Sequence, residues 1–252
     1  MKLDKAVLPM DYENYVFDLY GTLVDIHTEE GELELWEKLA MFYGYYRAIY
    51  TPKELQNRYG ELINSKEREL KSSLENNPKY SHEASPEIEI TDVFTELFRE
   101  KGVEPGHELS VHAGQFFRVL STIYIRLYPG TVEMIKALKA AGKKVYLLSN
   151  AQRIFTEYEM HTLDIFKYFD DVLISSDYKT RKPDKRFFDQ LICLHSIDPE
   201  QTLFIGNDST TDIKGAKSVG FSSFYINSNI SPQNDKTDAA DYNVVNFEKW
   251  DY

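Results

Sequence analysis

The stretch 15-YVFDLYGTL-23 decides the fold, because it joins a short apolar run to a turn through one acidic residue. Residues 15–19 are apolar except for Asp18, and Gly21 and Thr22 follow at once. Such a run is typical of a buried strand that ends in a turn. We therefore expect Asp18 to lie at the carboxyl end of the first core strand.

Short apolar segments alternate with segments of helical periodicity after Pro129 and Gly130. Repeated strand and helix units of this kind predict a parallel sheet covered by helices on both faces. The sequence therefore indicates an α/β fold with a doubly wound parallel sheet. The predicted strands are KVYLLSN (144–150), DVLISS (171–176), TLFIGND (202–208) and SSFYIN (222–227), and the clearest helices are TVEMIKALKAAG (131–142) and KRFFDQLICLHSI (185–197).

The first strand has no helix of its own, because residues 28–127 intervene with a different texture. Apolar residues recur there at helical spacing among many charges, including a segment near 108–126. A polar break at 76–78 and 81–86 divides the block. We predict a core made of residues 1–27 and 128–252, with residues 28–127 inserted as an α-helical cap domain.

Composition limits the classes of partner. The chain has 252 residues, 42% of them hydrophobic, and a net charge of −12. Such acidity gives no general attraction to nucleic acid or to an anionic membrane, and no stripe of basic residues is present. Neither is an expected partner. An anionic substrate would need a cation or a few placed basic groups to offset the repulsion. Oligomeric state stays open, since only a coiled coil is excluded.

Cysteine and histidine use excludes further classes of site. Cys193 is the only cysteine, so there is neither an intramolecular disulfide nor a cysteine-based zinc site, as in a reducing compartment. Its apolar neighbours in LICL predict a buried thiol. The six histidines show no metal-ligand spacing. The first residues lack a signal-peptide pattern and no long apolar run occurs, so a cytoplasmic location is expected.

Polar residues follow the predicted strands at their carboxyl ends, which is where open α/β sheets bind ligands. Together they would surround one opening with carboxylates, a hydroxyl and a cation. They are Asp18 after the first strand, Ser149 and Asn150 after the second, Lys182 after the third, and Asn207, Asp208 and Asp212 after the fourth.

Four of these segments resemble the ordered motifs of the haloacid dehalogenase-like hydrolase superfamily. They are DLYGTL (18–23), LLSN (147–150), KP (182–183) and IGNDSTTD (205–212). Each motif is weak alone, whereas four in order are specific. The resemblance covers the core and implies a Rossmann-like fold with an inserted cap, although the helical block matches only in position and helical character.

The resemblance implies a nucleophile and a metal. Asp18 would attack phosphorus and form an aspartyl-phosphate, which splits one difficult displacement into two easier ones. Mg²⁺ would bind Asp18, the backbone carbonyl of Tyr20 and Asp208, since it prefers carboxylate oxygens, water and phosphate. Asp212 would either bind the metal through water or orient Lys182. The roles of the two fourth-motif acids could be exchanged.

The remaining implied roles concern the substrate. Ser149 would donate a hydrogen bond to a phosphate oxygen, with Asn150 beside it, and Lys182 would balance charge on the transferring group. Thr22 is included among the substrate-binding residues and is expected to hydrogen-bond the turn. The predicted catalytic residues are Asp18, Tyr20 and Lys182.

Tyr20 departs from the phosphatase pattern, in which a second Asp two residues after the nucleophile acts as acid and base. A phenol with an ordinary pKa of about 10 is a poor base near neutrality, so hydrolysis of the intermediate is the step in question. Haloacid dehalogenases carry Tyr at this place. A metal-independent 2-haloacid dehalogenase is therefore the rival, and a protein that binds a phosphorylated ligand without turnover is a third possibility.

Two positions favour phosphoryl chemistry over dehalogenation. Asp208 retains a carboxylate that a cation would use, where dehalogenases show a Ser-x-Asn-x-x-Asp pattern. Phe188 stands where they place a Tyr. Arg47 could bind a substrate carboxylate but is more often a surface charge over aromatic rings. The sequence thus predicts a Mg²⁺-dependent hydrolase of a small phosphorylated metabolite.

Overall fold

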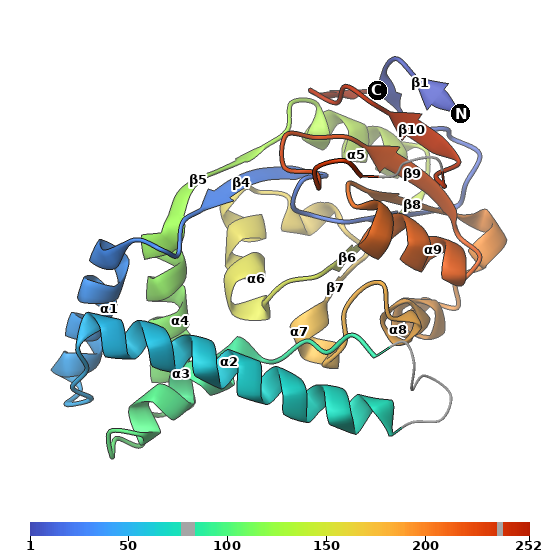
Figure 1. Ribbon diagram of the computed structural model, residues 1–252. Helices are drawn as coiled ribbons and strands as arrows, with labels where there is room; N and C mark the ends of the chain where they lie inside the picture. The colour runs from blue at the N-terminus through green and yellow to red at the C-terminus, as the bar shows by residue number, and fades with distance from the viewer. Residues whose placement is uncertain (77–83, 236–238) are drawn as a thin grey trace.

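The computed structural model describes residues 1–76, 84–235 and 239–252. Its centre is a sheet in which every neighbouring pair of strands is parallel. The predicted α/β class is therefore confirmed (Figure 1). In spatial order the strands are β1 (Lys2–Leu3), β10 (Tyr242–Val244), β9 (Ser222–Ile226), β8 (Thr202–Gly206), β3 (Asn14–Phe17), β6 (Lys144–Ser149) and β7 (Asp171–Ile174).

The strand order reverses at β3, which lies between β8 and β6. After β3 the chain builds β6 and β7 on one side, and then β8, β9 and β10 on the other. Phe17 at the end of β3 is paired in register with Leu147 of β6 and Ile205 of β8. The carboxyl ends of these three strands therefore meet at one edge, the place where doubly wound sheets bind ligands.

Helices cover both faces of the sheet, as the alternation along β3 shows. Tyr15 and Phe17 pack into the hydrophobic cluster of α5 and α6, whereas Val16 packs with α8 and α9. Successive side chains of a strand point to opposite faces, so a central strand buried on both faces is apolar throughout. The covering helices are α5 (Thr131–Ala140), α6 (Arg153–Thr162), α8 (Lys185–His195) and α9 (Lys214–Ser218).

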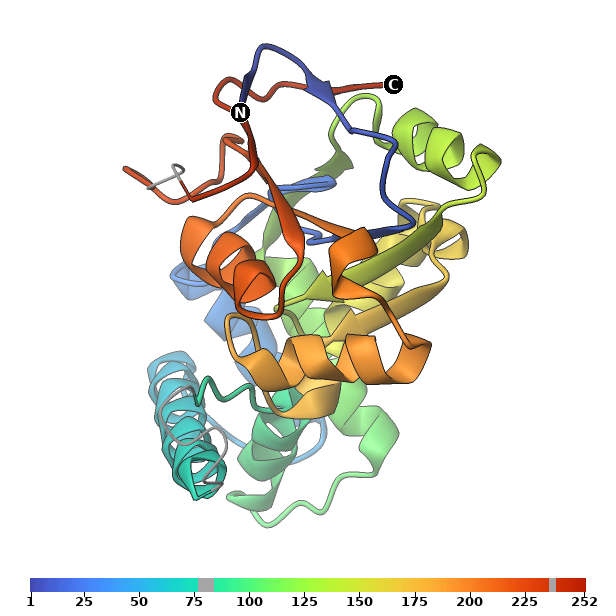
Figure 2. The same ribbon diagram turned by 90° about the vertical axis from the view of Figure 1, so that its right-hand side faces the viewer.

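Four helices form a separate hydrophobic cluster between β4 and β5, and we call residues 29–121 the helical insertion. Tyr43 stacks on Phe98 with ring centroids 4.2 Å apart. In the same cluster, Trp36, Phe94 and Phe117 pack around the ring of Tyr59. The insertion lies at one end of the sheet and the termini lie at the other (Figures 1 and 2). Its elements and the flanking strands are β4 (Val24–Thr28), α1 (Leu33–Tyr45), α2 (Pro52–Glu75), α3 (Ile90–Arg99), α4 (His107–Ser121) and β5 (Thr122–Leu127).

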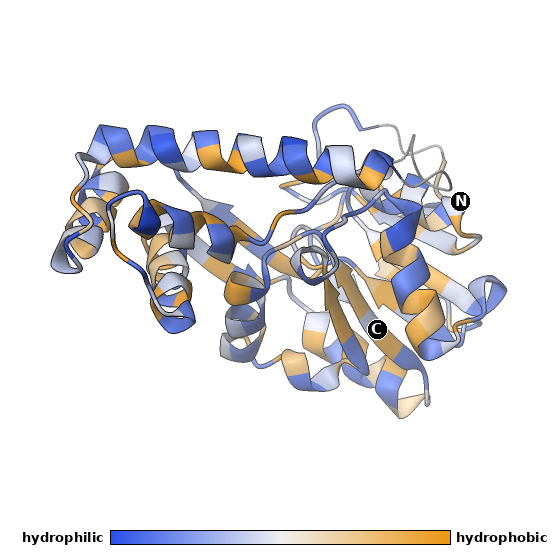
Figure 3. Ribbon diagram, turned by 90° about the horizontal axis from the view of Figure 1, so that it is seen from below, coloured by the Kyte–Doolittle hydropathy of each residue, from blue (hydrophilic) through white to orange (hydrophobic). Residues whose placement is uncertain are grey.

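The longest helix, α2, is polar along most of its length. It begins with a capping box between Thr51 and Glu54 and has Pro52 at its first position, which together fix its start. Only Leu55 and Tyr59 are buried, and the ribbon of α2 in Figure 3 is mostly hydrophilic while the sheet strands are hydrophobic. The N-terminal part of α2 therefore packs within the insertion, and its polar C-terminal part reaches the core, where the Leu74 carbonyl accepts from Arg186 of α8 at 3.0 Å.

Two expectations from the sequence are wrong. The helical pattern near 108–126 ends at Ser121, because residues 122–127 form β5 and pair antiparallel with β4. The β-branched residues Thr122, Ile123 and Ile125 favour a strand once such a partner is present. Cys193 is exposed rather than buried, because α8 turns Phe187, Phe188 and Leu191 toward the sheet.

Several short elements complete the described chain. The polar break predicted at 76–78 and 81–86 falls largely on residues 77–83, and these, with His82, lie outside the described residues. No helix in the described ranges is long and apolar enough to span a membrane. The remaining elements are β2 (Ala6–Val7), β11 (Trp250–Asp251), α7 (Ser175–Tyr178), two 3₁₀ turns (Phe166–Tyr168 and Pro199–Gln201) and a π-helical turn (Ser209–Ile213).

Replacing Gly130 by Ala is expected to destabilise the fold more than the same change at Gly142. Both glycines have left-handed backbone, with φ of +83° and +75°, where a side chain costs about 1–2 kcal/mol. At Gly130 a Cβ would also overlap with the carbonyl oxygen of Trp250, whereas at Gly142 it would meet open space. Urea unfolding of both variants measures the difference, and equal losses would contradict the close contact.

Candidate active site

Asp18 directly follows β3 and lies at the edge where β3, β6 and β8 end. Its backbone N–H donates to the carbonyl oxygen of Ile205 at 2.9 Å, so the residue is still fixed by the sheet. The chain then turns at once, with the Leu19 carbonyl accepting from the amides of Leu23 and Val24. The turn leaves the Asp18 carboxylate at the end of the strand, where Asp18 is only 7% exposed.

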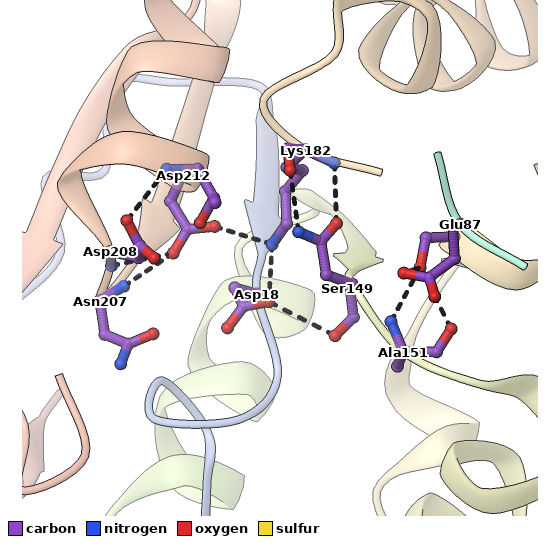
Figure 4. A network of polar contacts seen from close by, with 11 residues as sticks. Asp18, Glu87, Ser149, Ala151, Lys182, Asn207, Asp208 and Asp212 are labelled. Carbon is purple, nitrogen blue, oxygen red and sulfur yellow. Dashed lines mark hydrogen bonds and ion pairs between the residues drawn. The ribbon is translucent and has the colours of Figure 1, made fainter. Parts of the chain in front are cut away.

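Lys182 places a buried ammonium between two carboxylates. Its Nζ lies 2.6 Å from Oδ1 of Asp18 and 2.8 Å from Oδ1 of Asp212, with 1% of its side chain exposed (Figure 4). On the other side of Asp18, the Ser149 hydroxyl lies 3.4 Å from the same oxygen. The structure therefore brings together Asp18, Ser149, Lys182 and Asp212, which four separate segments of the chain supply.

The side chain of Asn150 hydrogen-bonds the backbone of Lys182. Its Oδ1 accepts from the Lys182 N–H at 2.8 Å and its Nδ2 donates to the Lys182 carbonyl at 3.0 Å. The oxygen and the nitrogen of the Asn150 amide thus both hydrogen-bond the backbone of Lys182.

The two fourth-motif acids differ in their surroundings. Asp208 is the N-cap of the π-helical turn, and its Oδ1 accepts from the amides of Thr210 and Thr211. Asp212 is buried within that turn, and its Oδ2 accepts from the amides of Asn207 and Asp208. Asp212 thus orients Lys182 while its second oxygen is held by the backbone.

Glycine at position 206 is required by this arrangement. A Cβ there would overlap with the Asp212 carboxylate, which packs directly on the end of β8. Asn207 makes a similarly close approach to the nucleophile loop, since its amide lies where a Cβ of Gly21 would be. The side chain of the fourth motif that packs on the loop is therefore Asn207, and the Asp208 carboxylate caps its own turn instead.

The oxygen donors at this edge suit a hard divalent cation in chemistry and charge. Two buried carboxylates, Asp18 and Asp212, share the single ammonium of Lys182, so the site retains excess negative charge. Within the described ranges, however, no three His, Cys, Asp or Glu side chains are grouped closely enough to hold a metal. The predicted set of Asp18, the Tyr20 carbonyl, Asp208 and Asp212 is therefore not preassembled in this conformation.

The charge imbalance is reflected in the pKa values of the buried groups. Burial, together with the charges of Asp18 and Asp208, raises the pKa of Asp212 to about 7 against the attraction of Lys182. Burial alone would lower the pKa of Lys182, but its two carboxylate partners outweigh that effect and raise it. Lys182 therefore stays charged, and Asp212 is the group that exchanges a proton near neutrality.

Tyr20 directs its hydroxyl away from this ion pair, toward helix α6. The hydroxyl donates to Oε2 of Glu159 at 2.5 Å and lies 3.0 Å from Oγ1 of Thr156. Burial and the nearby charge of Glu159 raise the pKa of the Tyr20 phenol further. In this arrangement Tyr20 is a neutral hydrogen-bond donor.

Thr22 and Arg47 lie in different surroundings. The Thr22 hydroxyl is fully buried and has no hydrogen-bond partner in the described chain, so the expectation that it hydrogen-bonds the loop is wrong. The loop is instead supported by Trp250, whose Nε1 donates to the Thr22 carbonyl at 3.1 Å. Arg47 is exposed, as expected for a surface charge.

Two buried glutamates and one partly buried arginine near the site were not singled out from the sequence. Glu159 of α6 and Arg118 of α4 form an ion pair beside Tyr20. Glu87 accepts from Gln152 at 2.8 Å and Ser175 at 3.0 Å, next to the loop that follows β6. The sequence does contain a signal for Glu159, because this charged residue lies on the same helix face as the buried Thr156 and Met160.

The segment that carries Glu87 docks on the segment that carries Lys182. Pro86 and Thr180 form an antiparallel bridge. The Arg181 amide donates to the Ser85 carbonyl at 3.1 Å, and the Glu87 amide donates to the Lys179 carbonyl at 3.3 Å. The helical insertion is therefore attached to the core at a point far along the chain from β4 and β5.

Asp212→Asn is expected to gain stability relative to the native chain as pH rises. The folded pKa of about 7 lies above the unfolded value of 3.8, so the favourable contribution of the protonated acid is present below pH 3.8 and lost as pH rises through 7. Urea unfolding from pH 5 to pH 8 measures the difference between the two proteins. Asp92→Asn, at an exposed acid of α3, is the control, and a pH-independent difference for Asp212→Asn would contradict the prediction.

Comparison with known proteins agrees with this geometry. Phosphoglycolate phosphatase from Vibrio vulnificus (strain YJ016) is 32% identical over 157 residues, which are 62% of this chain and 59% of that protein. The chain thus matches about three fifths of that relative's length. Among solved structures, an HAD phosphatase from Thermococcus onnurineus has a TM-score of 0.54 at 19% identity, covering 92% of this chain and 93% of that one.

A dehalogenase structure is similar to the same degree, with a TM-score of 0.52 at 19% identity and 94% coverage of both chains. These structural likenesses show the fold and do not separate the two chemistries. The family model of haloacid dehalogenase-like hydrolases matches residues 12–220, which is most of the chain and includes all four motifs. The chain belongs to the haloacid dehalogenase-like hydrolase family.

Proposed function

We propose that the protein is a Mg²⁺-dependent phosphatase that hydrolyses a small phosphorylated metabolite through an intermediate on Asp18. The observation that carries this is the asymmetric environment of the Asp18 carboxylate. Oδ1 is held by Lys182 at 2.6 Å and faces Ser149, whereas Oδ2 has no hydrogen bond within the described residues. One oxygen is thus fixed and the other is available to attack.

In the first step Oδ2 of Asp18 would form a bond to phosphorus while the bond to the ester oxygen breaks. The leaving oxygen takes a proton from solvent. Lys182 offsets the negative charge shared by the nucleophile and the phosphoryl group, and the Ser149 hydroxyl donates to a phosphoryl oxygen. Water then attacks phosphorus, breaks its bond to Asp18 and releases inorganic phosphate, with the proton of the water passing to the product or to solvent.

The metal, when bound, would neutralise charge on the phosphoryl oxygens and orient them for in-line attack. Asp18 and the Tyr20 carbonyl remain its proposed ligands, together with Asp208 and Asp212. Because the Asp208 carboxylate caps its own turn, it would have to use Oδ2. The amide of Asn207 is the other oxygen donor of this motif beside the nucleophile loop.

Support for phosphoryl chemistry comes from the relative and from Phe188. The relative with 32% identity is named as a phosphatase. Phe188, which stands where dehalogenases carry a Tyr, is fully buried in the core, packed on Phe204 with ring centroids 5.6 Å apart. It therefore offers no polar group to a haloacid. Dehalogenation remains the alternative, because Tyr20 is the residue that the dehalogenases have.

We further propose that residues 28–127 act as a cap over the site, with the core formed by 1–27 and 128–252. The insertion has a hydrophobic cluster of its own and reaches the core beside Lys182 through Pro86 and Thr180. A cap in this place excludes water and contacts the part of the substrate that distinguishes one metabolite from another.

Asp18→Asn is expected to abolish turnover while leaving the chain folded. The amide is nearly isosteric but is not a nucleophile, and it also loses the charge that attracts Lys182. Release of phosphate from 4-nitrophenyl phosphate measures activity, and circular dichroism with urea unfolding measures folding. A folded variant with near-native activity would show that the intermediate does not form on Asp18.

A paired assay separates the two chemistries. 4-nitrophenyl phosphate and 2-chloropropionate are supplied side by side, each with Mg²⁺ and with a chelator. We expect phosphate release that requires the metal, since phosphoryl charge needs neutralisation in an acidic site. Chloride release that persists with the chelator would instead establish the dehalogenase, and no product in any arm would favour a ligand-binding role.

A further inference from the structure

The hydroxyl of Tyr20 belongs to a buried cluster that joins three parts of the molecule. Tyr20 lies in the nucleophile loop, Glu159 on core helix α6 and Arg118 on α4 of the helical insertion. Arg118 donates through Nε to Oε1 of Glu159 at 2.6 Å, and through Nη2 to Oε2 at 3.3 Å. Oε2 of Glu159 therefore accepts from both the guanidinium and the phenol, while Oε1 accepts from the guanidinium.

The cluster is largely buried and lies at the wall of a cavity of about 620 Å³, which Arg118, Phe155 and Glu159 help to line. The side chains of Arg118 and Glu159 are 17% and 7% exposed, and the guanidinium lies 5.7 Å from the centre of the Tyr20 ring and 5.4 Å from that of Phe155. A buried carboxylate without partners is strongly disfavoured, so Glu159 favours the arrangement that keeps both donors in place. Since one donor comes from the insertion and one from the loop, the two are linked through Glu159.

The phenol is engaged in a way that leaves it little freedom. Its one proton is donated to Glu159, and its oxygen also lies within hydrogen-bond distance of Thr156. Tyr20 is two residues from Asp18 in the chain. Fixing the ring of Tyr20 against α6 therefore restricts the backbone that carries the nucleophile, while Lys182 fixes the carboxylate itself.

We propose that Glu159 and Arg118 are positioning residues, which hold Tyr20 and the Asp18 loop in the reactive conformation when the helical insertion is docked on the core. This rests on the proposed function for its kinetic consequence. Tyr20 then links the docked position of the insertion to the conformation of the Asp18 loop, through its hydrogen bond to Glu159. A misplacement of a reacting group by about 1 Å is enough to reduce turnover by up to about a hundredfold.

Three substitutions probe the cluster without altering Asp18. Tyr20→Phe removes only the hydroxyl, Glu159→Gln removes the charge with nearly the same shape, and Arg118→Met removes the insertion's contribution. Arg58→Met is the matched control, because Arg58 forms ion pairs with Glu61 and Glu100 inside the insertion and does not contact Tyr20.

Kinetics with 4-nitrophenyl phosphate and Mg²⁺ form the first readout. We expect each of the three variants to lower kcat about tenfold with KM changed less than about twofold, because positioning acts on the reacting atoms and not on ground-state binding. The double variant Tyr20→Phe/Glu159→Gln should be no slower than the slower single variant, as for residues that act as one unit. Unchanged kcat in folded variants, or losses that simply multiply, would overturn the proposal.

Hydrogen–deuterium exchange gives a readout that needs no turnover. Amides of residues 18–24 should exchange faster in Tyr20→Phe and Glu159→Gln than in the native chain and in Arg58→Met. If exchange responds in this way but no phosphate ester is hydrolysed, positioning is supported and the proposed phosphatase fails. If phosphate is released normally and the loop exchanges at the native rate in all variants, the phosphatase stands and positioning fails.

Discussion

The arrangement of the site depends on one buried ammonium, that of Lys182, placed between the carboxylates of Asp18 and Asp212. Three charged groups can be buried together only when each has close partners of opposite charge or hydrogen-bond partners, and the surrounding strands and loops provide these partners. The ends of β3 and β8 bring the acids to one edge. Asn150 fixes the peptide of Lys182, and the lack of a side chain at Gly206 lets the Asp212 carboxylate pack against the strand. The sheet is thus the frame on which opposite charges are held at fixed distances.

The core strands and most residues of the site were predictable, because they follow from local patterns in the sequence. Apolar runs ending in polar residues located the strands, and their order in the chain placed Asp18, Ser149 and Lys182 at one edge. Strand β5 was missed because residues 122–127 are short and continue the apolar spacing of α4, so only the pairing with β4 decides their conformation. Cys193 was misplaced for a related reason: an apolar run does not say which side of a helix faces the sheet.

The directions of the side chains within the site were harder to predict than which residues belong to it. Asp208 turns to cap the following turn, a local hydrogen-bond choice that leaves Asn207 packed on the nucleophile loop. The contacts of Glu159 join residues that are 41 and 139 positions apart in the chain, and no spacing rule reports them. What the sequence does record is a charged residue on a buried stripe. A charged residue on a buried face indicates that a partner of opposite charge or a hydrogen-bond donor is nearby, but it does not identify that partner.

The bridge between Pro86 and Thr180 has a kinetic meaning beyond its place in the fold. The helical insertion is joined covalently to the core at β4 and β5, and this bridge beside Lys182 is one of its noncovalent attachments, together with the ion pair of Arg118 and Glu159. Any outward swing of the insertion about the two strands must break it. If the insertion acts as the proposed cap, each opening for substrate entry or product release would have to break this bridge, and that cost would add to the time of one turnover.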